Sequence, residues 1–127
     1  MPDAMIIQVK ALISNPKSSE DIMERQILLV ECKRPSRDTP LGWDDTITGQ
    51  FLDDLSQTLN FSERLFGAVA IGKKVKFYQF DGKAQVGQQL APLHQGILDM
   101  DDPNGCSQVE GMMNHIKANA WQWAISL

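Results

Sequence analysis

The sequence contains few of the residues that build metal clusters, disulfide frameworks or cysteine-based active sites. Its 127 residues include two cysteines, Cys32 and Cys106, and two isolated histidines, His94 and His115. Zinc sites need closely spaced cysteines and histidines, and small secreted domains need several disulfides. The composition therefore excludes a zinc-binding module and a disulfide scaffold. Two distant cysteines are typical of an intracellular protein with reduced thiols.

Long hydrophobic runs are also absent. No apolar segment approaches the roughly 20 residues that a membrane-spanning helix requires. The first residues, Met1 to Ala4, lack the basic start and apolar core of a secretory signal. We therefore expect an intracellular protein with no membrane partner.

An excess of positive charge is missing as well. The chain has 12 Lys and Arg residues against 16 Asp and Glu residues, which gives a net charge of -4. A protein that binds nucleic acid through its whole surface is usually basic, because it neutralises phosphates. The charge therefore argues against an avid, non-specific binder. It leaves room for a local site, since Lys33, Arg34 and Arg37 follow one apolar run.

Apolar runs and turn residues predict a single α/β domain over residues 1–127, with a mixed central sheet flanked by helices. Strands are expected at residues 5–13, 26–33, 65–71 and 75–80, the last of them at an edge of the sheet. The continuous apolar runs at 27–30 and 65–71 are typical of strands that are buried on both faces. Residues 83–105 predict mostly loop, with a short element near 96–98.

Two helices complete a β-β-α-β-β-α order. Asp44 and Asp45 suit the N-terminus of the first helix, which we expect to end at residues 60–62. Its apolar side chains recur every four residues and are Ile47, Phe51, Leu55 and Leu59. Ser107 is expected to cap the last helix, and any exposed part of that helix's apolar side would form a homodimer interface.

The most informative segment joins a buried strand to a pair of opposite charges. The apolar run 27–30 is followed by Glu31, Cys32 and Lys33. Since side chains alternate along a strand, Glu31 and Lys33 project to one face of the sheet and Cys32 to the other. A carboxylate and an amine at the end of a buried strand are costly to desolvate without a partner. Their placement predicts a metal or substrate site.

This pattern resembles the PD-(D/E)XK nuclease-like superfamily, the restriction-endonuclease-like fold of restriction enzymes, junction resolvases and many repair nucleases. Pro2-Asp3 opens the first strand, as the family's PD pair does, and Glu31-Cys32-Lys33 matches its acid-x-Lys triplet. A second triplet, Asp81-Gly82-Lys83, is predicted to lie in a turn. The resemblance covers residues 2–80.

The residues after the triplet extend the resemblance. Arg34 and Pro35 follow Lys33, and Gln50 lies on the next predicted helix, a pattern similar to the nuclease domains of restriction-motor subunits. The resemblance implies a metal-dependent nuclease that hydrolyses phosphodiester bonds of DNA, with RNA as the less favoured substrate. Its cofactor would be Mg²⁺, or Mn²⁺ in its place.

The resemblance also implies a role for each residue of the site. Asp3 and Glu31 would supply carboxylate ligands to the cation, and the Cys32 backbone carbonyl would supply a third oxygen. Lys33 would orient the attacking water or stabilise charge in the transition state. Gln50 would hold Lys33 or a substrate phosphate.

Two arginines and two departures from the family complete the prediction. Arg34 and Arg37 flank the site and are expected to contact substrate phosphate. Family members usually have a helix before the first strand, and because Asp3 is almost the first residue we expect that helix to be missing or replaced. Either the sequence is a piece of a longer chain, or the C-terminal helix or a partner chain covers that face. The tyrosine that some exonuclease branches place four residues after the glutamine is replaced by Asp54.

Two other functions remain open at this point. A degenerate nuclease fold would serve as a catalytically inactive binding or assembly module, and the acidic composition and the missing helix favour it. A small hydrolase using the Cys32 thiol would need a nearby histidine as its base. Metal binding separates the nuclease from the inactive module, and thiol alkylation tests the hydrolase.

Overall fold

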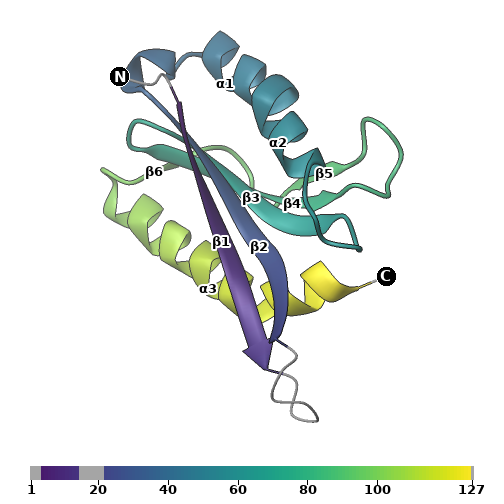
Figure 1. Ribbon diagram of the computed structural model, residues 1–127. Helices are drawn as coiled ribbons and strands as arrows, with labels where there is room; N and C mark the ends of the chain where they lie inside the picture. The colour runs from purple at the N-terminus through teal and green to yellow at the C-terminus, as the bar shows by residue number, and fades with distance from the viewer. Residues whose placement is uncertain (1–3, 15–21, 127) are drawn as a thin grey trace.

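The chain folds as a mixed six-stranded sheet with helices on both faces, in a computed structural model that describes residues 4–14 and 22–126. Helices α1 and α2 lie on one face, and α3 lies across the other (Figure 1). The strands are β1 (Ala4–Ser14), β2 (Ile22–Lys33), β3 (Arg64–Ile71), β4 (Lys74–Asp81), β5 (Leu90–Pro92) and β6 (Leu98–Asp99). The helices are η1 (Pro35–Arg37), α1 (Pro40–Thr46), η2 (Ile47–Phe51), α2 (Leu52–Ser56) and α3 (Pro103–Ile125). The predicted α/β class is confirmed.

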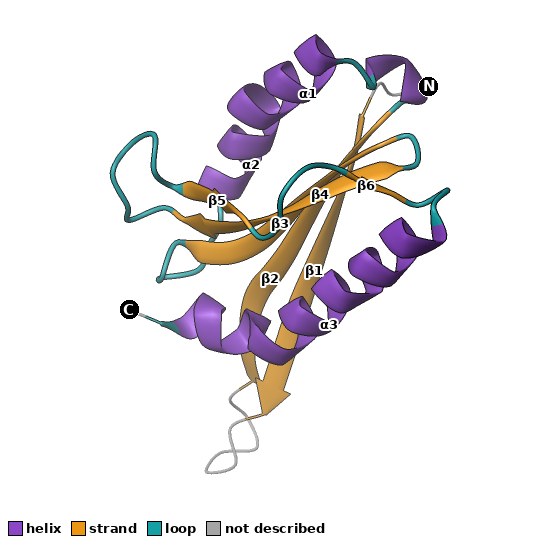
Figure 2. Ribbon diagram, turned by 180° about the vertical axis from the view of Figure 1, so that it is seen from behind, coloured by secondary structure: helices purple, strands orange, loops and turns teal. Residues whose placement is uncertain are grey.

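Strand β2 lies between β1 and β3 in a sheet of order β1-β2-β3-β4-β5, and β6 also pairs with β4. β1 is antiparallel to β2 and β3 is antiparallel to β4, whereas β2 and β3 run parallel, with Glu31 opposite Val69. A parallel pair needs a crossover connection, and α1, η2 and α2 provide it (Figure 2). The crossover therefore lies on the face of the sheet that receives Glu31.

A β-bulge in β2 decides which side chains face α2. Val9 pairs with Leu28, but the next residue, Lys10, pairs with Gln26, so that Ile27 is the extra residue. Ile27 and Leu28 both pack into the core under α3. Gln26 is thereby turned to the other face, where it lines a cavity beside α2.

Each face of the sheet has its own apolar core. Under α1 and α2 the buried side chains are Leu29, Trp43, Phe51, Leu55, Leu65, Val69, Ile71, Tyr78 and Phe80. Under α3 they are Leu28, Phe66, Ala68, Val75, Phe77, Leu98, Ile116 and Ala120. The predicted burial of β3 on both faces is confirmed, because its side chains contribute to both clusters.

The first helix begins earlier than predicted. Thr39, rather than Asp44 or Asp45, is its N-cap, and Thr39 Oγ1 accepts a hydrogen bond from Gly42 N at 3.0 Å. Pro40 occupies the first helical turn, where a missing N–H costs nothing. The Thr-Pro pair therefore outweighs the two aspartates, which lie inside the helix.

The four-residue apolar repeat holds only as far as Leu55. Ile47, Phe51 and Leu55 all pack against the core, since the segment Ile47–Phe51 is π-helical and therefore has a wider turn. α2 then ends at Ser56, before the predicted end at residues 60–62. Leu59 consequently lies outside the helix and is 96% exposed.

The C-terminal part of the chain also differs from the prediction. α3 begins at Pro103 with Asp102 as its N-cap, so that Ser107 lies inside the helix. Asp and Pro at consecutive positions form a stronger start signal than an isolated serine. The segment predicted as mostly loop contributes β5, and β6 lies at the short element predicted near residues 96–98; both strands pair with β4. β4 is therefore an interior strand, and the predicted edge position was wrong.

Helix α3 packs most of its apolar side against the sheet. Its residues Ile116 and Ala120 are buried against the sheet. Among the large apolar side chains of α3, Met113 is the one that is strongly exposed, at 45%. A homodimer through this helix stays a prediction. None of the helices in the described ranges is both long and apolar enough to cross a membrane.

Candidate active site

The predicted acid and base lie together at the end of β2. Both point to the face that carries α1 and α2, and Lys33 Nζ is 3.8 Å from Glu31 Oε1. The Glu31 side chain is completely buried, whereas that of Lys33 keeps 14% of its exposure. The predicted placement of the two side chains on one face is therefore confirmed.

Gln50 reaches this pair from the π-helical segment η2. Gln50 Oε1 accepts a hydrogen bond from Lys33 Nζ at 3.3 Å. π-helical turns are rare and occur frequently at functional sites. Lys33 of the acid-x-Lys triplet is thus in contact with the helix glutamine. In the sequence the two are related only through the family motif.

Asp54 is a further member of the site that the sequence did not single out. It lies on α2, four residues after Gln50, and positions four apart share one side of a helix. Its carboxyl group lies close enough to the Glu31 carboxyl to act on its pKa. The sequence shows the four-residue spacing of Gln50 and Asp54. It does not show which side of α2 packs toward β2.

The closeness of the half-buried Asp54 carboxyl to the fully buried Glu31 carboxyl changes the acidity of the site. Burial, with a smaller effect of the Asp54 charge, raises the pKa of Glu31 to about 7, although Lys33 acts to lower it. Within the described chain, Glu31 Oε1, Glu31 Oε2 and Asp54 Oδ2 are buried without a hydrogen-bond partner. Ionised carboxylates only accept hydrogen bonds, so the two groups satisfy each other only when one is protonated. Near neutral pH the pair therefore needs either a proton or a cation.

These unsatisfied oxygens fit a hard divalent cation, because Mg²⁺ binds through one or two carboxylates and keeps several waters. Among the described residues there is no group of three or more His, Cys, Asp and Glu side chains that could hold a metal. Asp3, the other predicted carboxylate ligand, lies outside the described residues. The role of the Cys32 carbonyl stays a prediction.

A small cavity of about 180 Å³ opens on the basic side of the site. It is lined by Lys33, Arg37, Gly42, Asp45, Thr46 and Gln50. The predicted phosphate contact Arg37 is thus brought to the site, and Arg34 is exposed directly after β2. An anionic group that enters this cavity would meet the side chains of Lys33 and Arg37.

The geometry does not support the cysteine hydrolase. Side-chain alternation directs Cys32 to the face opposite Glu31, and burial, followed by the Glu31 charge, raises the pKa of the Cys32 thiol. A nucleophilic thiol needs a lowered pKa. His94 Nε2 is already used, since it accepts a hydrogen bond from Phe77 N at 3.0 Å, and His115 packs edge-on against Phe66. Both Cys32 and Cys106 are free thiols.

The candidate site therefore combines a buried and a half-buried carboxyl group, a lysine and an amide on the α1–α2 face of the sheet. Comparison of the chain with protein-family models, with curated proteins and with solved structures found no match. The assignment of a function accordingly depends on the residues of the site themselves.

Proposed function

We propose that this chain is a metal-dependent nuclease of the PD-(D/E)XK type that hydrolyses phosphodiester bonds of DNA, with RNA as the second substrate class. The observation that carries the proposal is the contact of Lys33 with both Glu31, at 3.8 Å, and Gln50, at 3.3 Å. Glu31 and Lys33 come from a strand and Gln50 comes from a helix. Gln50 lies 17 positions after Lys33 in the chain. A solvated surface pair would not require the glutamine or the burial of Glu31.

The order of elements supports a restriction-endonuclease-like core. Strands β1 and β2, the α1–α2 crossover and β3 follow one another in the order that the family motif requires. β5 and β6 would then be additions at the far side of β4. In this assignment the acid-x-Lys triplet occupies the end of the central strand β2.

Glu31 and Asp54 are the described residues that would hold the cation, with Asp3 and the Cys32 carbonyl as further ligands implied by the family pattern. A bound Mg²⁺ or Mn²⁺ would supply charge neutralisation at the phosphate and a lower pKa for an attacking water. The buried, unsatisfied oxygens of Glu31 and Asp54 support this role.

The remaining side chains of the site would act on the substrate directly. Lys33, held by Gln50, would donate to the attacking water or to a phosphoryl oxygen that gains charge in the transition state. Arg37 would bind a neighbouring phosphate in the cavity that it lines with Lys33. Arg34 would contact the backbone of the nucleic acid at the outer edge of the site.

Cleavage of labelled DNA by the purified chain tests the proposal. We expect cleavage in Mg²⁺ or Mn²⁺, none in EDTA, and a loss of about 100-fold or more in Lys33→Ala. Lys83→Ala is the matched control, because Asp81-Gly82-Lys83 is the same kind of triplet but lies at the turn after β4. Unchanged cleavage in Lys33→Ala would overturn the nuclease assignment.

A catalytically inactive binding or assembly module is the second candidate. It is favoured by the observation that the described part of the site offers two acidic side chains rather than three. Titration calorimetry with Mn²⁺ separates the candidates. Heat of binding that disappears in Glu31→Gln supports the nuclease, whereas no binding by the unaltered chain supports the inactive module.

A further inference from the structure

The loop between α2 and β3 displays two large apolar side chains to solvent. Leu59 is 96% exposed and Phe61 is 83% exposed, although most other aromatic side chains are used in the core. Single exposed apolar residues are common and need no explanation. Two of them, separated by one residue and almost completely exposed, form a small apolar surface, which we call the Leu59–Phe61 platform.

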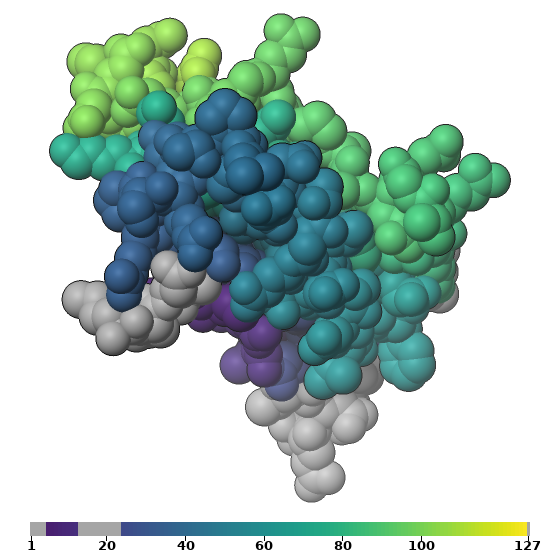
Figure 3. All heavy atoms as spheres, turned by 90° about the horizontal axis from the view of Figure 1, so that it is seen from above, coloured from purple at the N-terminus to yellow at the C-terminus, as the bar shows by residue number. Residues whose placement is uncertain are grey.

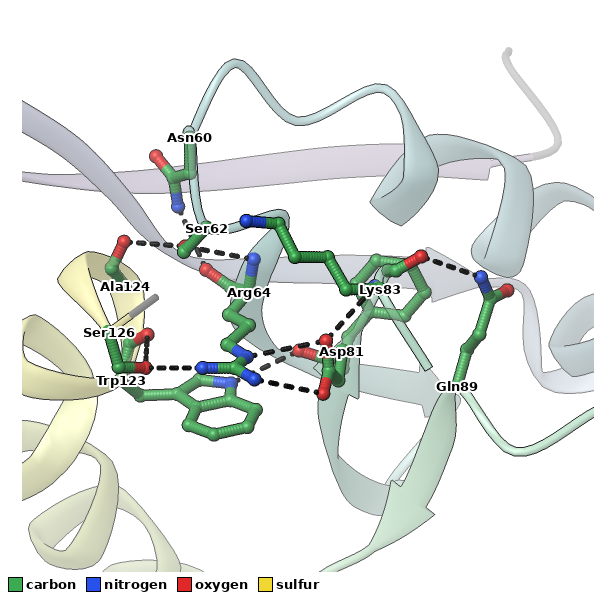
Figure 4. A network of polar contacts seen from close by, with 11 residues as sticks. Asn60, Ser62, Arg64, Asp81, Lys83, Gln89, Trp123, Ala124 and Ser126 are labelled. Carbon is green, nitrogen blue, oxygen red and sulfur yellow. Dashed lines mark hydrogen bonds and ion pairs between the residues drawn. The ribbon is translucent and has the colours of Figure 1, made fainter. Parts of the chain in front are cut away.

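Buried polar residues hold this loop in place. Asn60 Nδ2 donates to Gln26 O at 2.7 Å and to Arg64 O at 2.9 Å, and Asn60 Oδ1 accepts from Gln26 N at 3.0 Å. Ser62 Oγ donates to Ala124 O at 2.6 Å (Figure 4). Asn60 and Ser62 are therefore turned inward, and Leu59 and Phe61 are presented outward from a fixed loop.

Leu59 of the platform lines a cavity that reaches the candidate active site. Leu59 and Asn60 line a cavity of about 410 Å³ together with Asp54, whose carboxyl group faces Glu31. The other lining residues are Ile6, Gln8, Lys10, Glu24, Gln26 and Gln57. In Figure 3 the atoms of β1 (purple) are visible beside those of α2 and its following loop (teal). A chain bound at the site would continue toward the platform through this cavity.

The chemistry of this cavity differs from that of the basic side of the site. Its polar lining combines the amides of Gln8, Gln26 and Gln57 with the carboxyl groups of Glu24 and Asp54, and the ammonium group of Lys10 is paired with Glu24 at 3.3 Å. Amides form hydrogen bonds with base edges, and apolar or aromatic side chains stack on unpaired bases, whereas carboxyl groups such as those of Glu24 and Asp54 repel phosphates. The cavity and its rim therefore suit bases more than backbone.

We propose that the Leu59–Phe61 platform stacks on unpaired bases of the substrate, so that the nuclease acts on DNA with a single-stranded segment beside the scissile phosphate. This inference rests on the proposed function and names its substrate class. Lys33 and Arg37 would then hold the backbone on one side of Glu31 and Asp54, and the platform would hold bases on the other. A continuous duplex would present no base face to Leu59 and Phe61.

Binding of fluorescein-labelled DNA tests the inference. The Lys33→Ala chain prevents cleavage, and its affinity is measured by anisotropy for an oligothymidine and for a hairpin duplex of equal length. We expect Leu59→Ser/Phe61→Ser to weaken single-strand binding about tenfold or more and to leave duplex binding within about twofold. Val86→Ser is the matched control, because Val86 is 94% exposed on the loop between β4 and β5. Phe61→Trp should retain single-strand affinity, and its fluorescence should be quenched by the oligothymidine.

Each remaining result has a defined meaning. Equal single-strand affinity with and without the platform overturns the inference. A parent chain that binds neither the oligothymidine nor the hairpin also overturns the inference. Light scattering that shows a dimeric parent and a monomeric double variant overturns it too, because the platform would then be a protein interface. Platform-dependent single-strand binding without cleavage in Mg²⁺ supports the platform and overturns only the nuclease activity.

Discussion

The fully buried Glu31 carboxyl on β2 lies next to the half-buried Asp54 carboxyl on α2, and Asp54 Oδ2 is itself buried. Like charges in such a place repel, and each also loses its hydration. The nearest compensating charge, Lys33 Nζ, is 3.8 Å from Glu31 Oε1 and is shared with Gln50. The pair is therefore a source of instability in the absence of a bound cation, and this property can be measured.

Stability of the metal-free protein should fall as the pH rises. The pKa of Glu31 increases from 4.5 to about 7 on folding. Between these values the folded chain binds more protons than the unfolded chain, so the free energy of unfolding decreases with pH and the loss is complete above the folded pKa. Glu31→Gln should flatten this dependence and raise the Tm at about pH 8. Calorimetric scans in EDTA across this range check it, and equal pH slopes for both proteins would contradict it.

A divalent cation should reverse that loss. At a Mn²⁺ concentration about 100 times its Kd, the free energy of unfolding should rise by about 2.7 kcal/mol, because only the folded chain brings the two carboxylates together. Asp54→Asn should remove most of this gain. Asp53→Asn is the control, since Asp53 is the adjacent acid of α2 but is exposed. Thermal scans at alkaline pH measure the effect, and an equal loss in both variants would point to general charge screening.

The sequence predicted the part of the site that depends on local rules. Alternation along a strand places Glu31 and Lys33 on one face whatever the rest of the chain does, and a continuous apolar run marks a central strand. The contact between Lys33 and Gln50 was available only through the family pattern, because nothing local joins residues on a strand and a helix that lie 17 positions apart.

The rest depended on tertiary geometry that the pattern does not encode. Asp54 became a site residue because the π-helical segment Ile47–Phe51 sets which side of α2 faces β2. The bulge at Ile27 exchanged the two faces of the sheet to which the side chains of β2 before Ile27 point. Leu59 continued the apolar repeat in the sequence but lies beyond the end of the helix, since hydrophobic periodicity does not mark where a helix stops.

Removal of the Cys32 thiol should leave hydrolysis intact. Cys32 lies on the opposite face of β2 from Glu31, and its raised pKa disfavours the thiolate. Cys32→Ala should therefore cleave DNA at close to the parent rate, and alkylation of the parent chain with iodoacetamide should have little effect on the remaining activity. A rate that falls with the extent of Cys32 modification, at unchanged Tm, would restore the thiol mechanism.

Close packing between Gly67 and the crossover helix should make this glycine important for the site. A Cβ at Gly67 would lie 2.6 Å from Phe51 Cζ and 3.2 Å from Leu55 Cδ2. Gly67→Ala should therefore push the helix from β3 and destabilise the fold by about 1–3 kcal/mol. Since Gln50 directly precedes Phe51 and Asp54 directly precedes Leu55 in the chain, cleavage at a temperature well below the Tm should fall as well.

Gly111→Ala provides the matched comparison for this change. Gly111 lies within α3, and nothing is within 4 Å of a Cβ added there. Alanine is a better helix former than glycine by about 1 kcal/mol, so this variant should be as stable as the parent or more stable. Denaturant unfolding of both variants measures the difference. A Gly67→Ala chain that matches Gly111→Ala in stability and cleavage would mean that Phe51 and Leu55 move aside without shifting Gln50 and Asp54.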